Sequence, residues 1–377
     1  MATFRQRGKK WYYRIDTYDD DGNRDQIEKG GFRTKKDAEI AALKIESELL
    51  DGINLDSGNV SFADYFLEWF ETYKEGHFSR DTDNLYKRHH EVVSQFFGKK
   101  PINKVTRSNL QKFLNDYGLG KDRDDKPRAK STVQKLKNTV GLCLDAAVYE
   151  GAIRRSPMFE ITINKNLVQQ KESEKFLNES EVIKLIEELL NGIRYDFTSR
   201  YMILIAIATG ARFSEVSALT TDCINYKEQY IKINKSWDAK ERNDFKSTKN
   251  KSSERIIPID QDTIDILKDY LANKRVMPMN NLVFGNSVGR PPSNKGVNKA
   301  LRKAQERIGI SEPITFHGLR HTHASLLLLH NVNIVYVSKR LGHSDITTTA
   351  RVYSHLLKEL DERGNVISNE MMKQLYA

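Results

Sequence analysis

The spacing of apolar residues changes along this chain, and the two places where it lapses are the strongest constraint on how the chain can fold. Near the N-terminus apolar and polar residues alternate, as in a half-buried strand, before a helical spacing begins at about residue 35. A polar break at 51–59 precedes a second region, in which apolar residues recur every three or four positions. Another break, at 163–175, precedes a third region that mixes apolar helices with strand-like runs. We therefore predict three domains, residues 1–56, 57–168 and 169–377.

The charge of the chain is unevenly distributed over these regions. The sequence carries 61 lysines and arginines against 51 acidic residues, which gives a net charge of +10. Residues 1–56 hold 11 basic and 12 acidic side chains, so the positive excess lies in the second and third regions. This balance favours a polyanionic partner.

Other features of the composition predict a cytoplasmic protein that does not enter a membrane. The sequence contains no apolar run of about 18 residues, the length that a transmembrane helix needs. Its first 14 residues lack the apolar stretch of a secretory signal. Cys143 and Cys223 both stand beside apolar residues, which predicts reduced core thiols and neither a disulfide framework nor a zinc site.

The first region has the pattern of a small sheet packed against one helix. Trp11, Tyr13 and Ile15 alternate with polar residues, 19–23 has the composition of a turn, and 24–29 can pair back. An apolar stripe predicts a helix over 35–50. Such a sheet can enter a DNA major groove, or it can belong to a charge-balanced domain that binds protein or nothing. The candidate DNA contacts are Arg5, Arg7, Lys9, Lys10, Arg14 and Arg24.

The second region predicts an all-α bundle. Aromatic residues recur at helical spacing over 62–73, and further helices are expected over 81–97, 109–117 and 131–149. The aromatic stripe is more typical of a bundle core than of a base-stacking platform. The loop 118–130 is basic and could follow a phosphate backbone, although charged loops are more often simply solvated. Its candidate DNA contacts are Lys121, Arg123, Lys126, Arg128 and Lys130.

The third region contains an arginine in a tight turn between two helices. An apolar helix over 199–208 ends at Gly210, and Arg212 follows with Glu215 three residues later. Such an arginine either forms a structural ion pair with Glu215 or binds an anion. Strand-like runs follow at 230–233, 244–248 and 255–259. We expect the last two to form a hairpin, whose turn carries Lys249 and Lys251.

Histidines and a tyrosine gather near the C-terminal end. Thr315 can begin a helix on which His317 and Arg320 share one face, and an imidazole beside a guanidinium suits phosphate chemistry. His317 and His321 could instead bind zinc, but the glutamate of the HExxH motif and a nearby cysteine are missing. His343 follows at a helix break, and Tyr353 lies on the next helix.

These residues occur in four motifs that resemble those of the tyrosine recombinase family, the phage-integrase type of site-specific recombinase. The motifs are ATGARFSEVSAL, TKNKSSERIIPI, HGLRHTHAS and LGHSDITTTARVYSH, and they span about residues 204–356. The resemblance implies a multidomain α+β fold. It consists of a three-stranded sheet with one helix that binds arm-type DNA sites, a helical core-binding (SAM-like) domain, and a mainly α catalytic domain with a small antiparallel sheet.

The resemblance also implies a role for each residue of the pattern. Tyr353 would attack a DNA phosphate, giving a 3′-phosphotyrosyl link and a free 5′-hydroxyl, without ATP or another cofactor. Arg212 and Arg320 would bind the phosphate oxygens, and Glu215 would orient Arg212. Lys249 would protonate the leaving oxygen, His317 would act as general acid–base on the tyrosyl proton, and His343 would donate a hydrogen bond to the phosphate. Lys246 and Lys251 are nearby alternatives to Lys249.

The partners implied are double-stranded DNA at core and arm attachment sites, further copies of the chain in a tetramer, an excisionase and a host DNA-bending factor. A family-based hypothesis places the tail after Tyr353 on a neighbouring protomer. Three other readings remain: a DNA-binding regulator without chemistry, a type IB topoisomerase and a dimer resolvase. The complete set of motifs and the small N-terminal domain favour an integrase of a phage or conjugative transposon.

Overall fold

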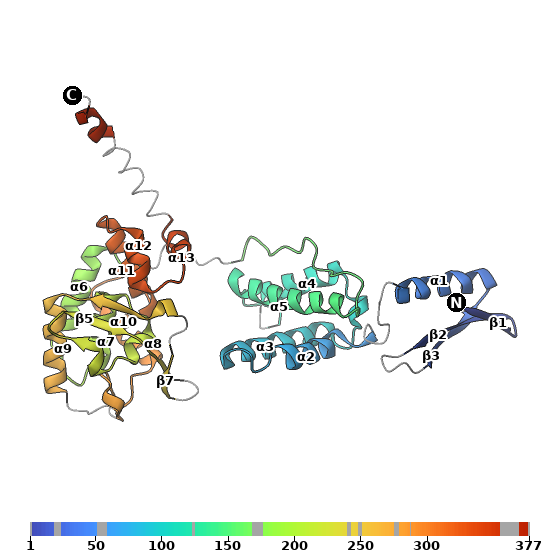
Figure 1. Ribbon diagram of the computed structural model, residues 1–377, viewed down its shortest axis with the longest axis horizontal. Helices are drawn as coiled ribbons and strands as arrows, with labels where there is room; N and C mark the ends of the chain where they lie inside the picture. Colours follow the sequence, from blue (N-terminus) through green and yellow to red (C-terminus); the bar gives the residue numbers. More distant parts are fainter. Residues whose placement is uncertain are drawn as a thin grey trace. The chain divides into compact units, whose positions relative to one another are not determined.

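A computed structural model describes residues 2–18, 24–50, 59–122, 125–167, 176–239, 243–247, 251–274, 279–286, 288–354 and 369–375. Contacts divide the chain into two units, residues 1–170 and 171–377 (Figure 1). The further division of the first unit near residue 56 remains a prediction. Within the described ranges, no helix is long and apolar enough to cross a membrane.

The N-terminal sheet consists of three antiparallel strands, β1(Thr3–Arg7), β2(Lys10–Tyr18) and β3(Arg24–Phe32), with β2 in the middle. The helix α1(Lys35–Leu50) packs against this sheet. Tyr13 and Ile15 alternate with polar neighbours and are buried with Ala42 of α1. Burial on one face only is what the period-2 pattern predicts, and the expected sheet-and-helix arrangement is confirmed.

The rest of the first unit consists of helices. They are α2(Phe62–Tyr73), α3(Arg80–Phe97), the short η2(Ile102–Lys104), α4(Arg107–Leu119) and α5(Lys130–Tyr149). The aromatic stripe of α2 is buried, with Phe62, Phe66 and Phe70 almost inaccessible to solvent. The stripe therefore forms the core of the bundle, as its spacing predicts.

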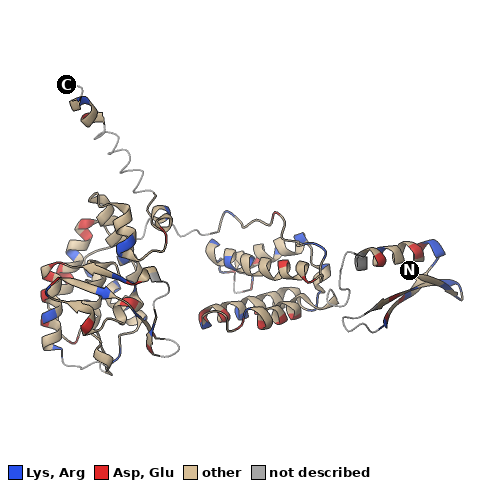
Figure 2. Ribbon diagram, in the orientation of Figure 1, with Lys and Arg blue, Asp and Glu red and all other residues tan. Residues whose placement is uncertain are grey.

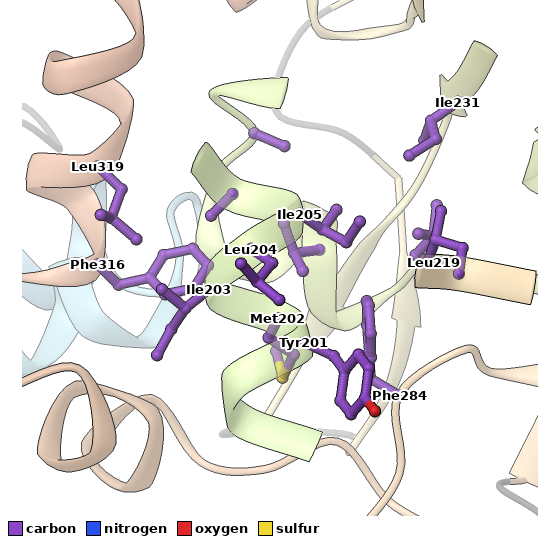
Figure 3. Close-up of a cluster of buried hydrophobic side chains, with 14 of the residues drawn as sticks. Tyr201, Met202, Ile203, Leu204, Ile205, Leu219, Ile231, Phe284, Phe316 and Leu319 are labelled. Carbon is purple, nitrogen blue, oxygen red and sulfur yellow. The ribbon is translucent and has the colours of Figure 1, made fainter. Parts of the chain in front are cut away.

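The second unit is mainly helical and surrounds a buried helix, α7(Thr198–Thr209). Figure 3 shows Ile203 of α7 beside Phe316 of a neighbouring helix, which also carries Leu319. The other helices are α6(Glu179–Leu190), α8(Phe213–Ser217), α9(Gln261–Asn273), α10(Asn294–Arg307), α11(Phe316–Leu329), α12(Ile334–Leu341), α13(Ile346–Val352) and the short η4(Thr221–Cys223), η5(Lys251–Ser253) and η6(Met279–Asn281).

Two small antiparallel sheets lie beside these helices. β4(Ile224–Asn225), β5(Tyr230–Ile233) and β8(Arg255–Pro258) form one, in the order β4-β5-β8, and β6(Ser236–Asp238) pairs with β7(Asp244–Lys246) in the other. The sequence predicted a hairpin between the strands that flank Lys249, and this pairing is wrong. β8 instead pairs with β5, because Ile257 opposite Ile231 places both side chains in the apolar core.

Candidate active site

Arg212 is held at the start of α8 by the carboxylate of Glu215. Gly210 ends α7 with a φ of +65°, and a Cβ there would lie 2.7 Å from the His323 ring. The chain can therefore turn sharply into Arg212 only because residue 210 is glycine. The Arg212 amide donates to Glu215 Oε2 over 2.8 Å, and its Nη1 donates to Oε1 over 2.8 Å. The Arg212 side chain remains 35% exposed, which leaves the guanidinium accessible to a ligand.

Glu215 is buried between two arginines, and the second of them was not identified from the sequence. Arg255 Nη2 lies 2.9 Å from Glu215 Oε2, and Arg255 Nε donates to the carbonyl of Arg340 over 2.6 Å. Burial alone would raise the pKa of Glu215, but the charge and hydrogen bond of Arg255, with help from Arg212, lower it overall. A signal was available, because Arg255 is in phase with buried Ile257 on β8, and a charge on a buried face requires a partner.

Among the described residues of the site, Arg320 is the most deeply buried cation. It lies on α11 with 3% of its surface exposed, and Nη1 donates to the carbonyl of Gly210 over 3.0 Å. Nη2 has no hydrogen-bond partner among the residues that the structure describes. Burial, and then the positive charge of Arg212, lower the pKa of Arg320 to about 9. A desolvated guanidinium with a free donor, near a second arginine, is a binding site for an anion.

His343 directly follows Gly342, whose carbonyl lies 3.5 Å from Arg212 Nη2. Burial, and then the charges of Arg320 and Arg212, lower the pKa of His343 to about 4, so its imidazole is neutral at neutral pH. Its Nδ1 lies 2.7 Å from Thr349 Oγ1. A hydroxyl that donates to Nδ1 places the ring proton on Nε2, where it can be donated to a phosphate.

Replacing Thr349 with valine should lower the rate of DNA cleavage about fivefold to tenfold, the value of one neutral hydrogen bond. Thr349 is fully buried, so valine fills the same space but cannot hold the tautomer of His343. The initial rate of cleavage measures the effect, and exposed Thr348 provides the control as Thr348→Val. Equal rates for the two variants would show that this hydrogen bond does not contribute to catalysis.

Tyr353 is buried at the end of α13. Only 2% of its surface is exposed, and its ring packs with Leu328 of α11 and Leu341 of α12. Its hydroxyl lies 3.1 Å from Nδ1 of His321. His317 is exposed, and its ring meets the His321 ring edge-on with centroids 5.0 Å apart. His321, which the sequence suggested only as a zinc ligand, is therefore in contact with the Tyr353 hydroxyl.

The structure brings five residues of the predicted pattern into one neighbourhood. The charges of Arg320 and Arg212 lower the pKa of His343, and Tyr353 lies close enough to Arg320 to raise its pKa. His317 joins the group through its ring contact with His321. The sixth residue, Lys249, lies outside the described residues, so its role stays a prediction. Of the two alternatives, Lys251 has no described side chain, and Lys246 is half-exposed with Nζ 3.8 Å from Asp238 Oδ2.

The predicted DNA contacts of the first region are basic residues that mostly form ion pairs on the sheet. Arg24 binds Asp16 over 2.9 Å and lowers its pKa through this hydrogen bond, and Arg14 lies 3.6 Å from the same carboxylate. Arg5 and Arg7 share Glu28 in the same way, whereas Lys9 and Lys10 are exposed. Figure 2 marks both signs of charge in this part of the chain. DNA would have to compete with these carboxylates, so the contacts stay predictions.

The basic loop after α4 is partly held by the protein itself. Arg128 is 10% exposed, is paired with Asp122, and lies 3.8 Å from the centre of the Tyr117 ring. Lys121 lies 2.7 Å from Asp116. Lys126 is exposed, Lys130 is half-buried, and Arg123 lies outside the described residues. Arg128 therefore has a structural role here, and Lys126 is the best placed of the described four to reach a phosphate.

Three family models match consecutive parts of the chain. A phage integrase family model matches residues 175–359, an arm DNA-binding domain matches 3–49, and a phage integrase N-terminal SAM-like domain matches 61–117. The chain belongs to the phage integrase family. Its members include the tyrosine recombinases, so the expected family and fold are confirmed.

Relatives and solved structures agree with this assignment. The chain is 26% identical to a XerC-like tyrosine recombinase of Caldanaerobacter subterraneus over 93% of this chain and 94% of that protein. It is 25% identical to the integrase of Staphylococcus phage L54a, over 84% of this chain and 95% of that protein. The fold resembles that of the Tn1549 transposon integrase solved with transposon right-end DNA, with a TM-score of 0.67 and 17% identity. The match covers 80% of this chain and 99% of that structure. It also resembles lambda integrase, solved as a tetramer bound to a Holliday junction, with a TM-score of 0.58 and 18% identity. This match covers 92% of this chain and 96% of that structure.

Proposed function

We propose that this phage integrase family member cleaves and rejoins duplex DNA at specific sites through Tyr353, and thereby integrates and excises a mobile element. The observation that carries the proposal is the buried Nη2 of Arg320, which has no protein acceptor in the described part of the chain. Arg212 and Tyr353 both lie close enough to shift the pKa of Arg320, Arg212 downward and Tyr353 upward. A phosphate in this position would meet two guanidinium groups and a tyrosine hydroxyl. These are the groups that phosphoryl transfer to a tyrosine requires.

In the proposed reaction the Tyr353 oxygen attacks the phosphorus and the bond to the 5′ oxygen breaks. Arg212 and Arg320 neutralise the charge that develops on the phosphate, and His343 donates a hydrogen bond to it. The leaving 5′ oxygen takes a proton from Lys249, and the tyrosyl proton passes to a histidine, for which the sequence suggests His317. Attack by a 5′-hydroxyl on the phosphotyrosine then rejoins the strand and restores Tyr353.

The partners follow from the family and from the relatives. We propose that residues 57–168 and 169–377 bind the core site, and that the N-terminal sheet binds arm sites. The Tn1549 transposon integrase has been solved in complex with a circular intermediate DNA, and lambda integrase as a tetramer bound to a Holliday junction. Both support DNA and further copies of the chain as partners. An excisionase, a DNA-bending host factor and a location on the nucleoid in the cytoplasm belong to the same proposal. The helix 369–375 exposes Met371, Met372 and Leu375, which suits docking on a neighbouring protomer.

The proposed cleavage is tested by trapping its covalent intermediate. Wild-type protein is mixed with a tiled set of nicked duplexes that cover the DNA on both sides of its gene. In such a duplex the short 5′-hydroxyl strand diffuses away after cleavage, so rejoining stops and the adduct accumulates. A protein–DNA adduct that survives denaturation supports the proposal, and relaxation of supercoils without strand exchange would favour a topoisomerase.

The lysine assignment can be tested by changing the leaving group. Lys249→Ala should slow cleavage about 10²–10⁴-fold, the usual value of a general acid. A substrate with sulfur in place of the bridging 5′ oxygen should restore the rate, because a thiolate leaves without protonation. Lys251→Ala is the control. A loss and recovery with Lys251→Ala, and normal cleavage with Lys249→Ala, would assign the general acid to Lys251.

A further inference from the structure

We infer that His323 and Arg340 are positioning residues, which fix the C-terminal end of α7 and thereby the two phosphate-binding arginines of the site. The inference rests on the proposed function, because it concerns the phosphate site that Arg212 and Arg320 form. Neither His323 nor Arg340 belongs to the catalytic pattern that the sequence predicts. Both act through the backbone and through other side chains.

His323 links α12 to α7. It is buried on α11, three residues after Arg320, and its Nδ1 lies 2.8 Å from the carbonyl of Ile207 in the last turn of α7. A carbonyl only accepts hydrogen bonds, so the ring proton is on Nδ1 and Nε2 keeps its lone pair. Nε of Arg340 on α12 donates to that lone pair over 2.9 Å. The neutral imidazole thus uses both ring nitrogens, one toward each helix.

Arg340 also binds a carbonyl of α7 directly. Its Nη2 donates to the carbonyl of Ala208 over 3.1 Å, and Arg320 Nη1 donates to that of Gly210 over 3.0 Å. The last carbonyls of a helix have no partner within the helix and carry a partial negative charge, which cations stabilise. Side chains of α11 and α12 therefore bind the carbonyls of residues 207, 208 and 210.

Both arginines of the phosphate site depend on this end of α7. Arg212 follows α7 after only Gly210 and Ala211, and Arg320 is bound to the Gly210 carbonyl. The His323 ring also packs against the backbone there, since a Cβ at residue 210 would lie 2.7 Å from it. A shift of residues 207–210 would therefore move both guanidinium groups. A misplacement of about 1 Å in a reacting group can lower a rate about 10²-fold.

The position of Arg340 matters for the other side of the site as well. Its own carbonyl accepts a hydrogen bond from Arg255 Nε over 2.6 Å. Arg255 in turn binds Glu215, the carboxylate that holds Arg212. His343 lies three residues after Arg340 on the same segment. The Arg340 side chain therefore anchors to α7 the segment that carries His343 and supports Glu215.

Phenylalanine at position 323 tests the inference, because it keeps a ring in place but can neither donate to Ile207 nor accept from Arg340. We expect the maximal rate of single-turnover adduct formation on the nicked duplex to fall about tenfold to 10²-fold. The protein concentration that gives half of this rate should stay within about threefold of the wild-type value, since contacts along the whole DNA backbone dominate the affinity.

Two further variants separate the hydrogen bonds. His323→Asn keeps a donor near the place of Nδ1 and should therefore lose less of the maximal rate than His323→Phe. Arg340→Leu should lose about as much as His323→Phe. The double variant should lose little more than either, because residues that act as one unit are not additive.

A variant that is destabilised elsewhere in the same domain provides the control. Leu267→Ala removes a fully buried side chain of α9 and should lower the thermal midpoint. Assayed well below that midpoint, it should form adduct at the wild-type rate. Thermal midpoints are measured for every variant, so that all rates are compared at a temperature where the proteins are folded.

Three results would overturn the inference: a wild-type maximal rate for His323→Phe and Arg340→Leu, a loss confined to the half-saturating concentration, or an equal loss of rate in Leu267→Ala. If His323→Phe does not fold, His323→Asn and Arg340→Leu decide between the same outcomes. Failure of the proposed function has a different signature, since the wild-type protein would then form no adduct.

Discussion

We expect phenylalanine in place of Tyr353 to abolish the covalent adduct and to leave DNA binding nearly unchanged. The ring is 2% exposed and packs in an apolar cluster, which phenylalanine fills equally well. Only the hydroxyl is lost, together with its hydrogen bond to His321, so the free energy of unfolding should fall by about 1 kcal/mol at most. Adduct is measured on a denaturing gel with the nicked duplex, and binding is measured on the uncut duplex.

A second tyrosine on the neighbouring helix supplies the control. Tyr336 of α12 is 45% exposed, and its hydroxyl accepts a hydrogen bond from Arg340 over 3.3 Å. Tyr336→Phe should form adduct at the wild-type rate. Adduct formation by Tyr353→Phe would mean that another residue is the nucleophile, and the catalytic assignment would have to be abandoned.

Methionine in place of Arg320 should abolish most of the activity and make the protein more stable. Loss of a preorganised donor to a charged transition state typically lowers the rate about 10²–10³-fold. The pKa of Arg320 is lower in the folded protein than in the unfolded chain, so the folded state binds this proton less tightly and the charge opposes folding at neutral pH. An apolar residue of similar length removes that cost, and we expect a gain of about 1 kcal/mol or more.

Cleavage rate and free energy of unfolding are measured on the same samples of Arg320→Met. An exposed arginine gives the comparison, because Arg302 is 72% exposed and paired with Glu306. Arg302→Met should change neither quantity by much. If Arg320→Met unfolds more easily than the wild type, then the hydrogen bond to Gly210 outweighs the cost of burying the charge. If it still cleaves at the wild-type rate, then Arg320 does not bind the phosphate.

Local patterns predicted most of the secondary structure because they record burial on one face of an element. The aromatic stripe over 62–73 and the alternation over 11–15 correspond to α2 and β2, each with its predicted face buried. The predicted hairpin around Lys249 was wrong because its strands are too short to carry such a pattern. Short strands such as β7 and β8 have few side chains to define a partner, and β8 was paired with β5 by the apolar core.

The candidate site likewise combines relations that local sequence predicts with contacts that depend on tertiary packing. The sequence by itself determined which chemical groups are available and which of them share a short segment: Arg212 with Glu215 three residues later, and His317 with Arg320 on one helix. These relations follow from backbone geometry over a single turn. Only the tertiary structure decided that Arg255 binds Glu215 from 40 positions away, and that His321 reaches Tyr353 across 32 positions. Contacts over such separations depend on how helices pack around a shared core, and the spacing of residues within one helix carries no information about that packing.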